Sequence, residues 1–222
     1  MRKIITILFT LFLCGCSSIP FKRIEYVSLE GIEPQVVRLQ FSRRLPQNFE
    51  VVNSTVFAYR HLKLSCLGPT HVDTLKQNFS VVGLNYVGMK LFELSFKNGT
   101  VDSKYIFPEL AKRGDFATAV CEDIKKIYFD RIPASESSVI RKRHKIIFRQ
   151  AQSGGFLEYV FAGRDNLLIE KNFYANGRKL WSVFYYEYVV NEKRVFPVGI
   201  ILRHYPYNYH LVIRLKEIRE SE

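Results

Sequence analysis

The sequence predicts a mainly β protein of the α+β class, in which one large antiparallel sheet is interrupted once by a helical segment. Three observations predict this fold. Apolar and polar residues alternate with a period of two along most of the chain, short turn sequences separate the alternating segments, and one central segment has helical spacing. Short connections favour a meander over crossover helices. A sheet of this length can curl into a barrel or half-barrel.

The N-terminus has the pattern of a secretory signal. Arg2 and Lys3 precede an apolar run over residues 4–13, and small residues follow it. A basic start, a short apolar run and a small-residue exit are the parts of such a signal, and the run is too short to span a hydrocarbon core of about 30 Å. The alternative is a short N-terminal helix buried in the fold.

The end of this segment resembles the lipobox of bacterial lipoproteins, in which a small residue precedes an obligatory cysteine. The resemblance implies that residues 1–15 are a signal peptide and that Cys16 is the lipidated first residue of the mature chain, although Cys14 is atypical for its place in the motif. Ser17, where Asp would retain a lipoprotein in the inner membrane, implies an outer-membrane anchor facing the periplasm. Three acyl chains would make that anchor effectively permanent. No later stretch is apolar enough to span a membrane.

Positive charge is the main compositional feature, because 33 Lys and Arg against 21 Asp and Glu give a formal net charge of +12. A periplasmic domain meets no cytoplasmic nucleic acid, so we assign the charge to anionic lipid surfaces or acidic partners. The densest run comprises Arg141, Lys142, Arg143 and Lys145. This run is either an ordinary solvated surface or a membrane-facing patch, where each cation adds about 1 kcal/mol.

The mature chain is expected to be a lipidated tether over residues 16–35, followed by a single domain over residues 36–222. The alternating pattern predicts the first strands of that domain at 37–41, 62–66 and 92–96. Asn98 and Gly99 form a hairpin turn after the third of these strands.

The strongest helical signal covers residues 115–130, within a helical insertion at about 112–142. Asp115 is placed as an N-cap. Four apolar residues recur at helical spacing, and these are Phe116, Val120, Ile124 and Ile127. Residues 134–142 are expected to form a second, short helix.

The rest of the chain returns to β structure. Segments rich in Tyr, Phe, Val and Ile predict strands at 143–149, 156–163, 166–174, 180–190, 196–204 and 208–218. The strand at 180–190 is apolar on both faces. It is therefore covered twice, by the barrel interior and by something else, such as a helix or a membrane surface, unless it is an ordinary central strand.

Catalytic and metal-binding patterns are missing from the sequence, which has no nucleophile elbow, no zinc-protease helix and no phosphate-binding loop. We therefore expect no enzyme activity, no metal site and no cofactor. Cys66 and Cys121 remain once the signal is removed and Cys16 is lipidated. They either form a disulfide in the oxidising periplasm or stay as buried thiols. A disulfide between them would stabilise the fold by about 4 kcal/mol.

Four short motifs carry a resemblance to a known family. They are Val82-Gly83-Leu84, the run from Gly88 to Gly99, the helix core Val120 to Ile124 with Tyr128 to Pro133, and His204-Tyr205 with Tyr209 to Leu215. The sequence resembles an uncharacterised family of bacterial outer-membrane lipoproteins found in aryl polyene gene clusters, although the usual Trp-Pro after the helix is missing. That family is similar to the periplasmic carrier and the outer-membrane receptor of lipoprotein localisation.

This second similarity implies an unclosed antiparallel β-barrel with a helical lid over a hydrophobic cavity that takes acyl chains. The helix at 115–130 would be the lid. Candidate lining residues are Phe92, Leu94 and Phe96, with Trp181 or Tyr186 opposite, and the alternative assigns each of them to a plain core. The receptor also has a protruding loop with an exposed Leu, for which the sequence offers no clear equivalent.

The leading hypothesis is a monomeric, non-enzymatic outer-membrane lipoprotein that binds acyl or polyene-lipid chains, or lipoprotein acyl groups, for transport or envelope insertion. The alternative is a scaffold lipoprotein that binds no lipid and holds envelope biosynthetic enzymes through a protein contact. An enzyme such as a thioesterase or acyltransferase ranks third, because it needs a polar constellation in the cavity. No nucleic-acid partner is expected.

Overall fold

Twelve strands and three helices make up the part of the chain that the computed structural model describes, residues 19–112 and 114–219. The strands are β1 (Asn48–Tyr59), β2 (Leu62–Asp73), β3 (Asn78–Leu84), β4 (Lys90–Lys97), β5 (Thr100–Ile106), β6 (Ser138–Lys142), β7 (Lys145–Gln152), β8 (Gly155–Ala162), β9 (Leu167–Ala175), β10 (Arg178–Asn191), β11 (Arg194–His204) and β12 (Tyr209–Arg219). The helices are α2 (Pro34–Arg44), α3 (Pro108–Ala111) and α4 (Phe116–Tyr128). None of these helices is both long and apolar enough to cross a bilayer. The predicted signal peptide and Cys16 lie outside the described residues.

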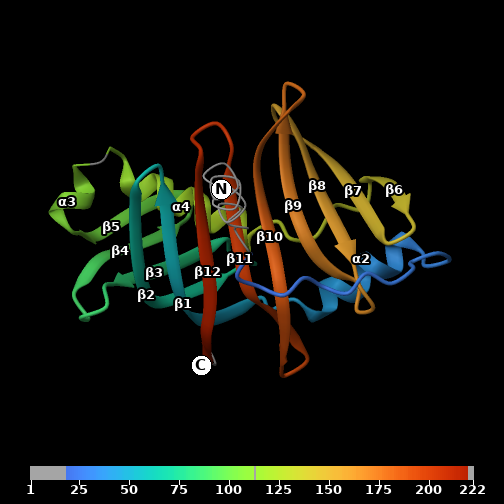
Figure 1. Cartoon of the computed structure of the whole chain (residues 1–222), viewed down its shortest axis with the longest axis horizontal. Helices are drawn as coiled ribbons and strands as arrows, with labels where there is room; N and C mark the ends of the chain where they lie inside the picture. The colour runs from blue at the N-terminus through green and yellow to red at the C-terminus, as the bar shows by residue number, and fades with distance from the viewer. Residues whose placement is uncertain (1–18, 113, 220–222) are drawn as a thin grey trace, which may run out of the picture.

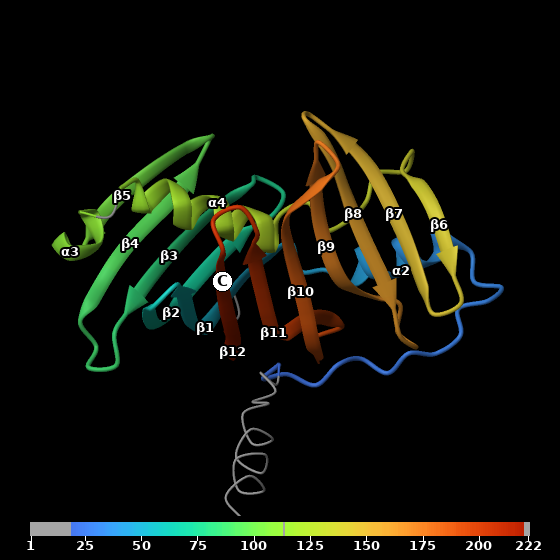
Figure 2. The same ribbon diagram turned by 45° about the horizontal axis from the view of Figure 1, so that its top comes forward.

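All twelve strands form one antiparallel sheet, as Figure 1 shows. Their order is β5-β4-β3-β2-β1-β12-β11-β10-β9-β8-β7-β6, so the first and last strands of the chain lie side by side at the centre. The edge strands β5 and β6 do not pair with each other. The sheet curls without closing (Figure 2), and the predicted unclosed antiparallel barrel is confirmed.

Most of the predicted strands are confirmed, and so is the hairpin between β4 and β5. Lys97 pairs with Thr100 across the turn. Asn98 and Gly99 have φ values of 51° and 80°. Two successive positive φ angles are what a two-residue turn of type I′ needs, and Asn-Gly adopts them with little strain.

The prediction of a strand at residues 37–41 is wrong, because this segment belongs to α2. Pro34 occupies the first turn of the helix, where its missing N–H costs nothing. Val37 and Phe41 are fully buried, whereas Leu39 between them is 44% exposed. The buried residues are four apart, a helical spacing that the regular alternation in the sequence concealed.

The predicted short helix at 134–142 is also wrong. Its second part is the edge strand β6, which pairs with β7 from Ser138–Arg149 to Lys142–Lys145. Every residue of β6 is exposed or half-exposed, so the strand carries little of the alternation that marks a half-buried strand. The helical insertion is therefore shorter than the predicted 112–142 and ends with α4.

α4 crosses the concave face of the sheet and has the predicted position and N-cap (Figure 1). The Asp115 carboxylate accepts a hydrogen bond of 3.1 Å from the backbone N–H of Thr118, and hydrogen bonding to Thr118 lowers the pKa of Asp115. At the other end, Nζ of Lys171 donates to the carbonyl oxygens of Lys126 (3.1 Å) and Phe129 (2.7 Å). A side-chain amine at a helix C-terminus satisfies carbonyl groups that have no partner within the helix.

The other half of the concave face is filled by side chains. α2 packs there through Phe41, whose ring lies edge-on to Phe161 at 5.3 Å, and Phe161 in turn contacts Phe148 at 5.6 Å. A hydrogen bond from Asn166 to Gln40 holds the helix against the β8–β9 turn. Aromatic packing beneath α2 thus occupies this part of the concave face.

The segment of residues 19–33, predicted to be part of a tether, lies against the convex face of the sheet (Figure 2). Phe21 is 6% exposed and stacks on Tyr186 at 5.5 Å. The Arg214 guanidinium lies 4.6 Å from the same ring. At Gly199, beneath the ring, a Cβ atom would lie 2.4 Å from Phe21. Both faces of β10 are apolar, and this segment covers the face that points away from the barrel interior.

Candidate functional site

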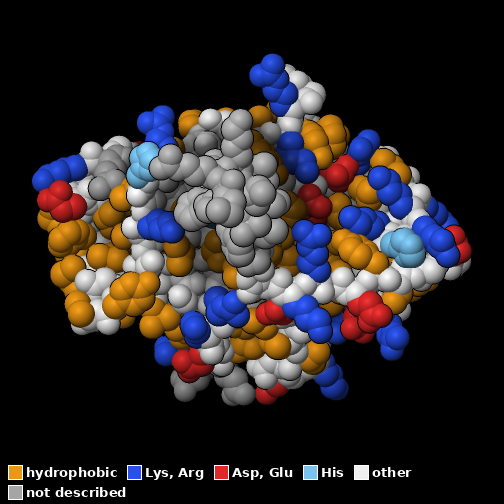
Figure 3. Space-filling model, in the orientation of Figure 1, with side chains coloured by type: hydrophobic (Ala, Val, Ile, Leu, Met, Phe, Trp, Pro, Cys, Tyr) orange, Lys and Arg blue, Asp and Glu red, His pale blue; other side chains and the backbone are white. Residues whose placement is uncertain are grey.

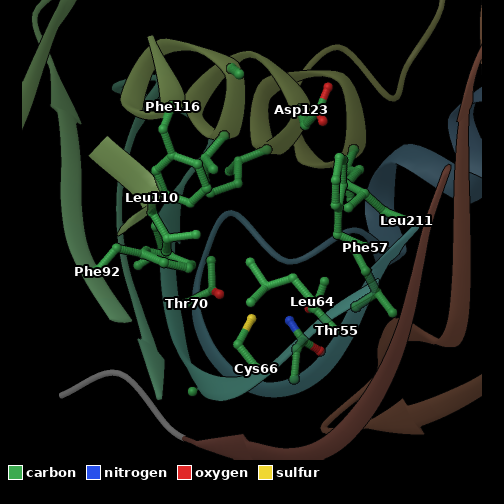
Figure 4. Close-up of a pocket in the computed structure, with 18 of the residues that line it drawn as sticks. Thr55, Phe57, Leu64, Cys66, Thr70, Phe92, Leu110, Phe116, Asp123 and Leu211 are labelled. Carbon is green, nitrogen blue, oxygen red and sulfur yellow. The ribbon is translucent and has the colours of Figure 1, made fainter. Parts of the chain in front are cut away.

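A cavity of about 430 Å³ lies between α4 and the sheet (Figure 4). Alternate residues of β1, β2 and β12 line it, since residues two apart on a strand share a face. These are Asn53, Thr55, Phe57, Tyr59, Leu62, Leu64, Cys66, Gly68, Thr70, Tyr209, Leu211 and Ile213. β3, β4 and α3 add Val81, Val82, Phe92 and Leu110. The lining is predominantly apolar, as is typical of a site for an apolar ligand.

The lid of the cavity is one face of α4. The four residues predicted for the lid, Phe116, Val120, Ile124 and Ile127, all line the cavity. Asp115, Ala119, Asp123 and Tyr128 complete the same face at helical spacing.

Phe92 closes the cavity on the β4 side. Its ring lies 5.4 Å from that of Phe116 on the lid, in an edge-on arrangement. Gly83 on the neighbouring strand makes room for this ring, because a Cβ atom at Gly83 would lie 2.4 Å from it. A glycine at this position therefore determines where Phe92 sits.

Leu94 and Phe96 do not line the cavity, contrary to prediction. Leu94 is 1% exposed within the core, and Phe96 stacks on Phe79 at 5.6 Å. Phe129, which follows α4, packs on Phe79 at 6.0 Å. The chain leaving the lid thus fills this end of the barrel with aromatic rings, so the inward face of β4 meets the cavity only at Phe92.

Trp181 and Tyr186 do not line the cavity either. Trp181 stacks on Phe173 at 5.9 Å, with Nζ of Lys171 5.6 Å from its ring. Tyr186 points to the convex face and stacks on Phe21. Its neighbour Tyr185 points inward, where its hydroxyl donates to the carbonyl of Ile127 at 2.8 Å.

A polar contact at the rim of the cavity was not predicted from the sequence. The Tyr209 hydroxyl lies 2.8 and 2.9 Å from the two carboxylate oxygens of Asp123, and Nζ of Lys126 lies 2.8 Å from one of them. Asp123 is 6% exposed, and burial raises the pKa of its carboxyl, an effect that Lys126 and Tyr209 oppose. Asp123 stands among apolar residues on one face of the predicted helix, and an acid in that position was the sign in the sequence that this face makes a polar contact.

A second polar pair lies deeper in the lining. The amide of Asn53 donates a hydrogen bond of 3.0 Å to the hydroxyl of Tyr128. Burial raises the pKa of Tyr128 to about 12, so the phenol stays neutral. The pair satisfies two buried polar groups without adding charge to the cavity.

A protein-family model matches residues 68–217, more than half of the chain, and is described as "Protein of unknown function (DUF3261)". The chain belongs to the DUF3261 family. No curated protein matches its sequence.

Solved structures similar to this DUF3261 protein include the following two. A LolA superfamily protein from Nitrosomonas europaea has a TM-score of 0.57 at 12% identity, over 85% of this chain and 93% of that one. An outer membrane lipoprotein-sorting protein domain from Vibrio parahaemolyticus has a TM-score of 0.52 at 9% identity, over 83% and 90%. At these identities the likeness concerns the fold, which is LolA-like, as the motif resemblance implied.

Cys66 and Cys121 of this DUF3261 protein are both free thiols in the structure, and no disulfide joins them. Cys66 lines the cavity, whereas Cys121 is fully buried on α4. Burial raises the pKa of each thiol to about 11. Both are therefore protonated at neutral pH and poor nucleophiles.

Within residues 19–112 and 114–219, no three His, Cys, Asp or Glu side chains gather in a way that could hold a metal ion. His204 stacks on the ring of Tyr209 (5.1 Å between centroids) and lies tilted against that of Tyr207 (4.7 Å). Burial lowers the pKa of His204 to about 4, so its ring is neutral at physiological pH.

The predicted basic patch lies at the far edge of the sheet from the cavity, on the β6–β7 hairpin, where Figure 3 shows several Lys and Arg side chains. Arg141 pairs with Glu33 at 2.8 Å, and Nζ of Lys145 lies 5.1 Å from the ring of Tyr26. The carbonyl of Arg143 accepts a hydrogen bond of 2.8 Å from Leu29. Part of this patch therefore holds the segment of residues 19–33.

The β3–β4 turn presents apolar side chains to solvent. Tyr86 is 84% exposed and Val87 is 86% exposed. The side chain of Asn85 accepts hydrogen bonds from the backbone N–H groups of Val87 (3.0 Å) and Met89 (2.9 Å) and so shapes the turn. The sequence did not single out this turn.

Proposed function

We propose that this protein is an outer-membrane-anchored lipoprotein of the periplasm that binds a hydrophobic chain beneath α4 for transport or envelope insertion. The observation that carries the proposal is the apolar cavity of about 430 Å³ under an amphipathic helix. An open interior is the feature that distinguishes a carrier from a scaffold whose barrel is packed solid. The chemistry is binding and not catalysis.

The size of the cavity supports one chain per molecule. A cavity of about 430 Å³ lies within the range of roughly 300–1,000 Å³ that is typical of small-molecule sites, so it has room for one acyl chain. Each methylene moved from water into an apolar site contributes about 0.8 kcal/mol. The ligand is therefore an acyl chain, a lipoprotein acyl group or a polyene-lipid chain of similar length.

Two features support a position at the membrane surface. Phe21 is held on the convex face, five residues after Cys16, so a lipid on Cys16 would tether the domain within about 18 Å of its anchor. The β3–β4 turn offers Tyr86 and Val87 for contact with lipid. Radiolabelled palmitate should enter the wild-type protein in cells and not the Cys16→Ser variant. Incorporation of palmitate into both proteins would overturn the proposed lipid anchor on Cys16.

Ligand binding is tested with a fluorescent long-chain acyl amide and the purified protein. We expect saturable uptake with one chain per molecule. Leu64→Trp, which places an indole in the cavity, should abolish uptake. Leu67→Trp is the matched control, because Leu67 lies on the same strand, is 41% exposed and does not line the cavity. Equal uptake by both variants, or none by the wild type, would refute the carrier proposal.

A further inference from the structure

The charged residues among the described lining of the cavity are acids, although the chain as a whole is basic. The chain carries 33 Lys and Arg, yet none of them and no His is among the described residues that line the cavity. The two charged residues in the lining are Asp115 and Asp123, both acids on the lid. A head group that emerges from the cavity therefore meets a carboxylate at either end of this helix face.

Asp123 is the more buried of these acids and lies where α4 meets β12 (Figure 4). Its carboxylate receives the Tyr209 hydroxyl and the Lys126 ammonium. Lys126 does not line the cavity, so the anionic member of the pair is the one that faces a ligand. An ionised carboxylate has about four acceptor sites, which leaves room for one more donor.

Asp115 places a second carboxylate in the cavity lining, at the N-terminal end of the lid. It caps the helix through Thr118, and this hydrogen bonding lowers the pKa of Asp115. The nearest lysines on the lid are already engaged, since Lys125 pairs with Glu122 at 2.7 Å and Lys126 with Asp123 at 2.8 Å. None of the described residues that line the cavity is a cation that could neutralise a ligand carboxylate.

We propose that the cavity selects chains with an uncharged, hydrogen-bond-donating head, such as an amide or a hydroxyl group, over free fatty-acid anions. This inference rests on the proposed function. A fatty-acid carboxylate would be desolvated beside a second carboxylate whose cation, Lys126, is already paired with it, whereas an amide N–H can donate to Asp123. A hydrogen bond to a charged group is typically worth a factor of about ten in affinity or more.

The experiment compares palmitate with palmitamide, which share one chain and differ only in the head. Each ligand displaces the fluorescent acyl amide from the full chain at pH 8, where monomeric palmitate is ionised. Palmitamide should bind at least about tenfold more tightly. Asp123→Asn removes the charge with little change of shape and should reduce that ratio at least about threefold. The matched control is Glu122→Gln, an exposed acid on the same helix that does not line the cavity, and it should leave the ratio unchanged.

Asp115→Asn provides a second variant, because Asn caps helices as well as Asp and the fold should be retained. Asp115→Asn should also reduce the ratio of the affinity for palmitamide to the affinity for palmitate. Equal affinity for the two ligands, tighter binding of palmitate, or a ratio that neither variant alters would overturn the inference and leave the carrier proposal standing. Failure of the wild type to bind either ligand would refute both proposals.

Discussion

The hydroxyl of Tyr209 bridges both carboxylate oxygens of Asp123, at 2.8 and 2.9 Å, and so ties the last strand of the sheet to the lid helix. The two residues are 86 positions apart in the chain. They meet because β12 pairs with β1 at the centre of the sheet and α4 crosses above that pairing. This contact closes one side of the cavity and places a charge at its rim.

Tyr209→Phe should lower the free energy of unfolding by about 1.5–3 kcal/mol, the range for a hydrogen bond to a charged group. The loss arises because a buried carboxylate then lacks one of its donors. Tyr207→Phe is the control, since Tyr207 is 68% exposed and should tolerate loss of its hydroxyl. Urea denaturation measures both variants, and equal stabilities would show that the Tyr209 hydroxyl does not hold the lid.

Lys171 should make stability depend on pH. Burial lowers the pKa of Lys171 from 10.5 to about 7 in the folded protein. Between about pH 7 and 10.5 the unfolded chain therefore binds more protons than the folded one, and stability rises with pH by at most about 1.4 kcal/mol per unit.

Lys171→Met removes this titration while keeping an unbranched side chain. The difference in free energy of unfolding, wild type minus variant, should rise from pH 7 to 10 in a series of denaturant titrations. Other groups titrate in the same range, but they do so in both proteins and cancel in the difference. If the free energies of unfolding of the two proteins change with pH in parallel, Lys171 keeps its ordinary pKa.

Gly83 should control the width of the cavity through Phe92. Gly83→Ala places a Cβ atom 2.4 Å from the present position of the Phe92 ring, so the ring must move. We expect uptake of the acyl amide to weaken about tenfold or more, with a stability loss of about 1–3 kcal/mol for an overpacked site. Adding Phe92→Leu to Gly83→Ala should restore uptake, because the smaller side chain frees the space. Failure of this rescue would mean that Gly83 acts on the backbone and not on the ring.

Cys66 and Cys121 should both be free. Unfolding the protein in denaturant without reductant, followed by alkylation and mass spectrometry, should give two modified thiols in residues 19–222. In the folded protein at pH 8 both should react slowly, because burial raises the pKa of each to about 11. A protein that gains no label at either position until it is reduced would carry the disulfide that the sequence left open.

Local patterns were sufficient where local physics decides the structure. Asp115 followed by Phe116, Val120, Ile124 and Ile127 predicted a capped helix, and that helix lies over the cavity. The same reasoning failed at residues 37–41, because alternation and helical spacing coincide over so short a segment. It failed again at β6, whose edge position leaves both faces exposed.

The cavity lining was only partly predictable. Phe92, Leu94 and Phe96 share one face of β4, and nothing local separates them. Phe92 meets open space, whereas Phe96 lies under rings that reach it from Phe79 and from Phe129 beyond the helix. Whether an inward side chain lines a cavity or a core depends on which distant segment covers it.

Neighbouring residues alone specify an antiparallel sheet and an amphipathic helix, because strand alternation and helix periodicity are local properties. Contacts between distant segments place α2 in one half of the barrel and leave the cavity beneath α4, and they turn Tyr185 inward while Tyr186 lies under Phe21. A cavity is defined by the absence of a packing partner. That absence depends on contacts between residues far apart in the chain.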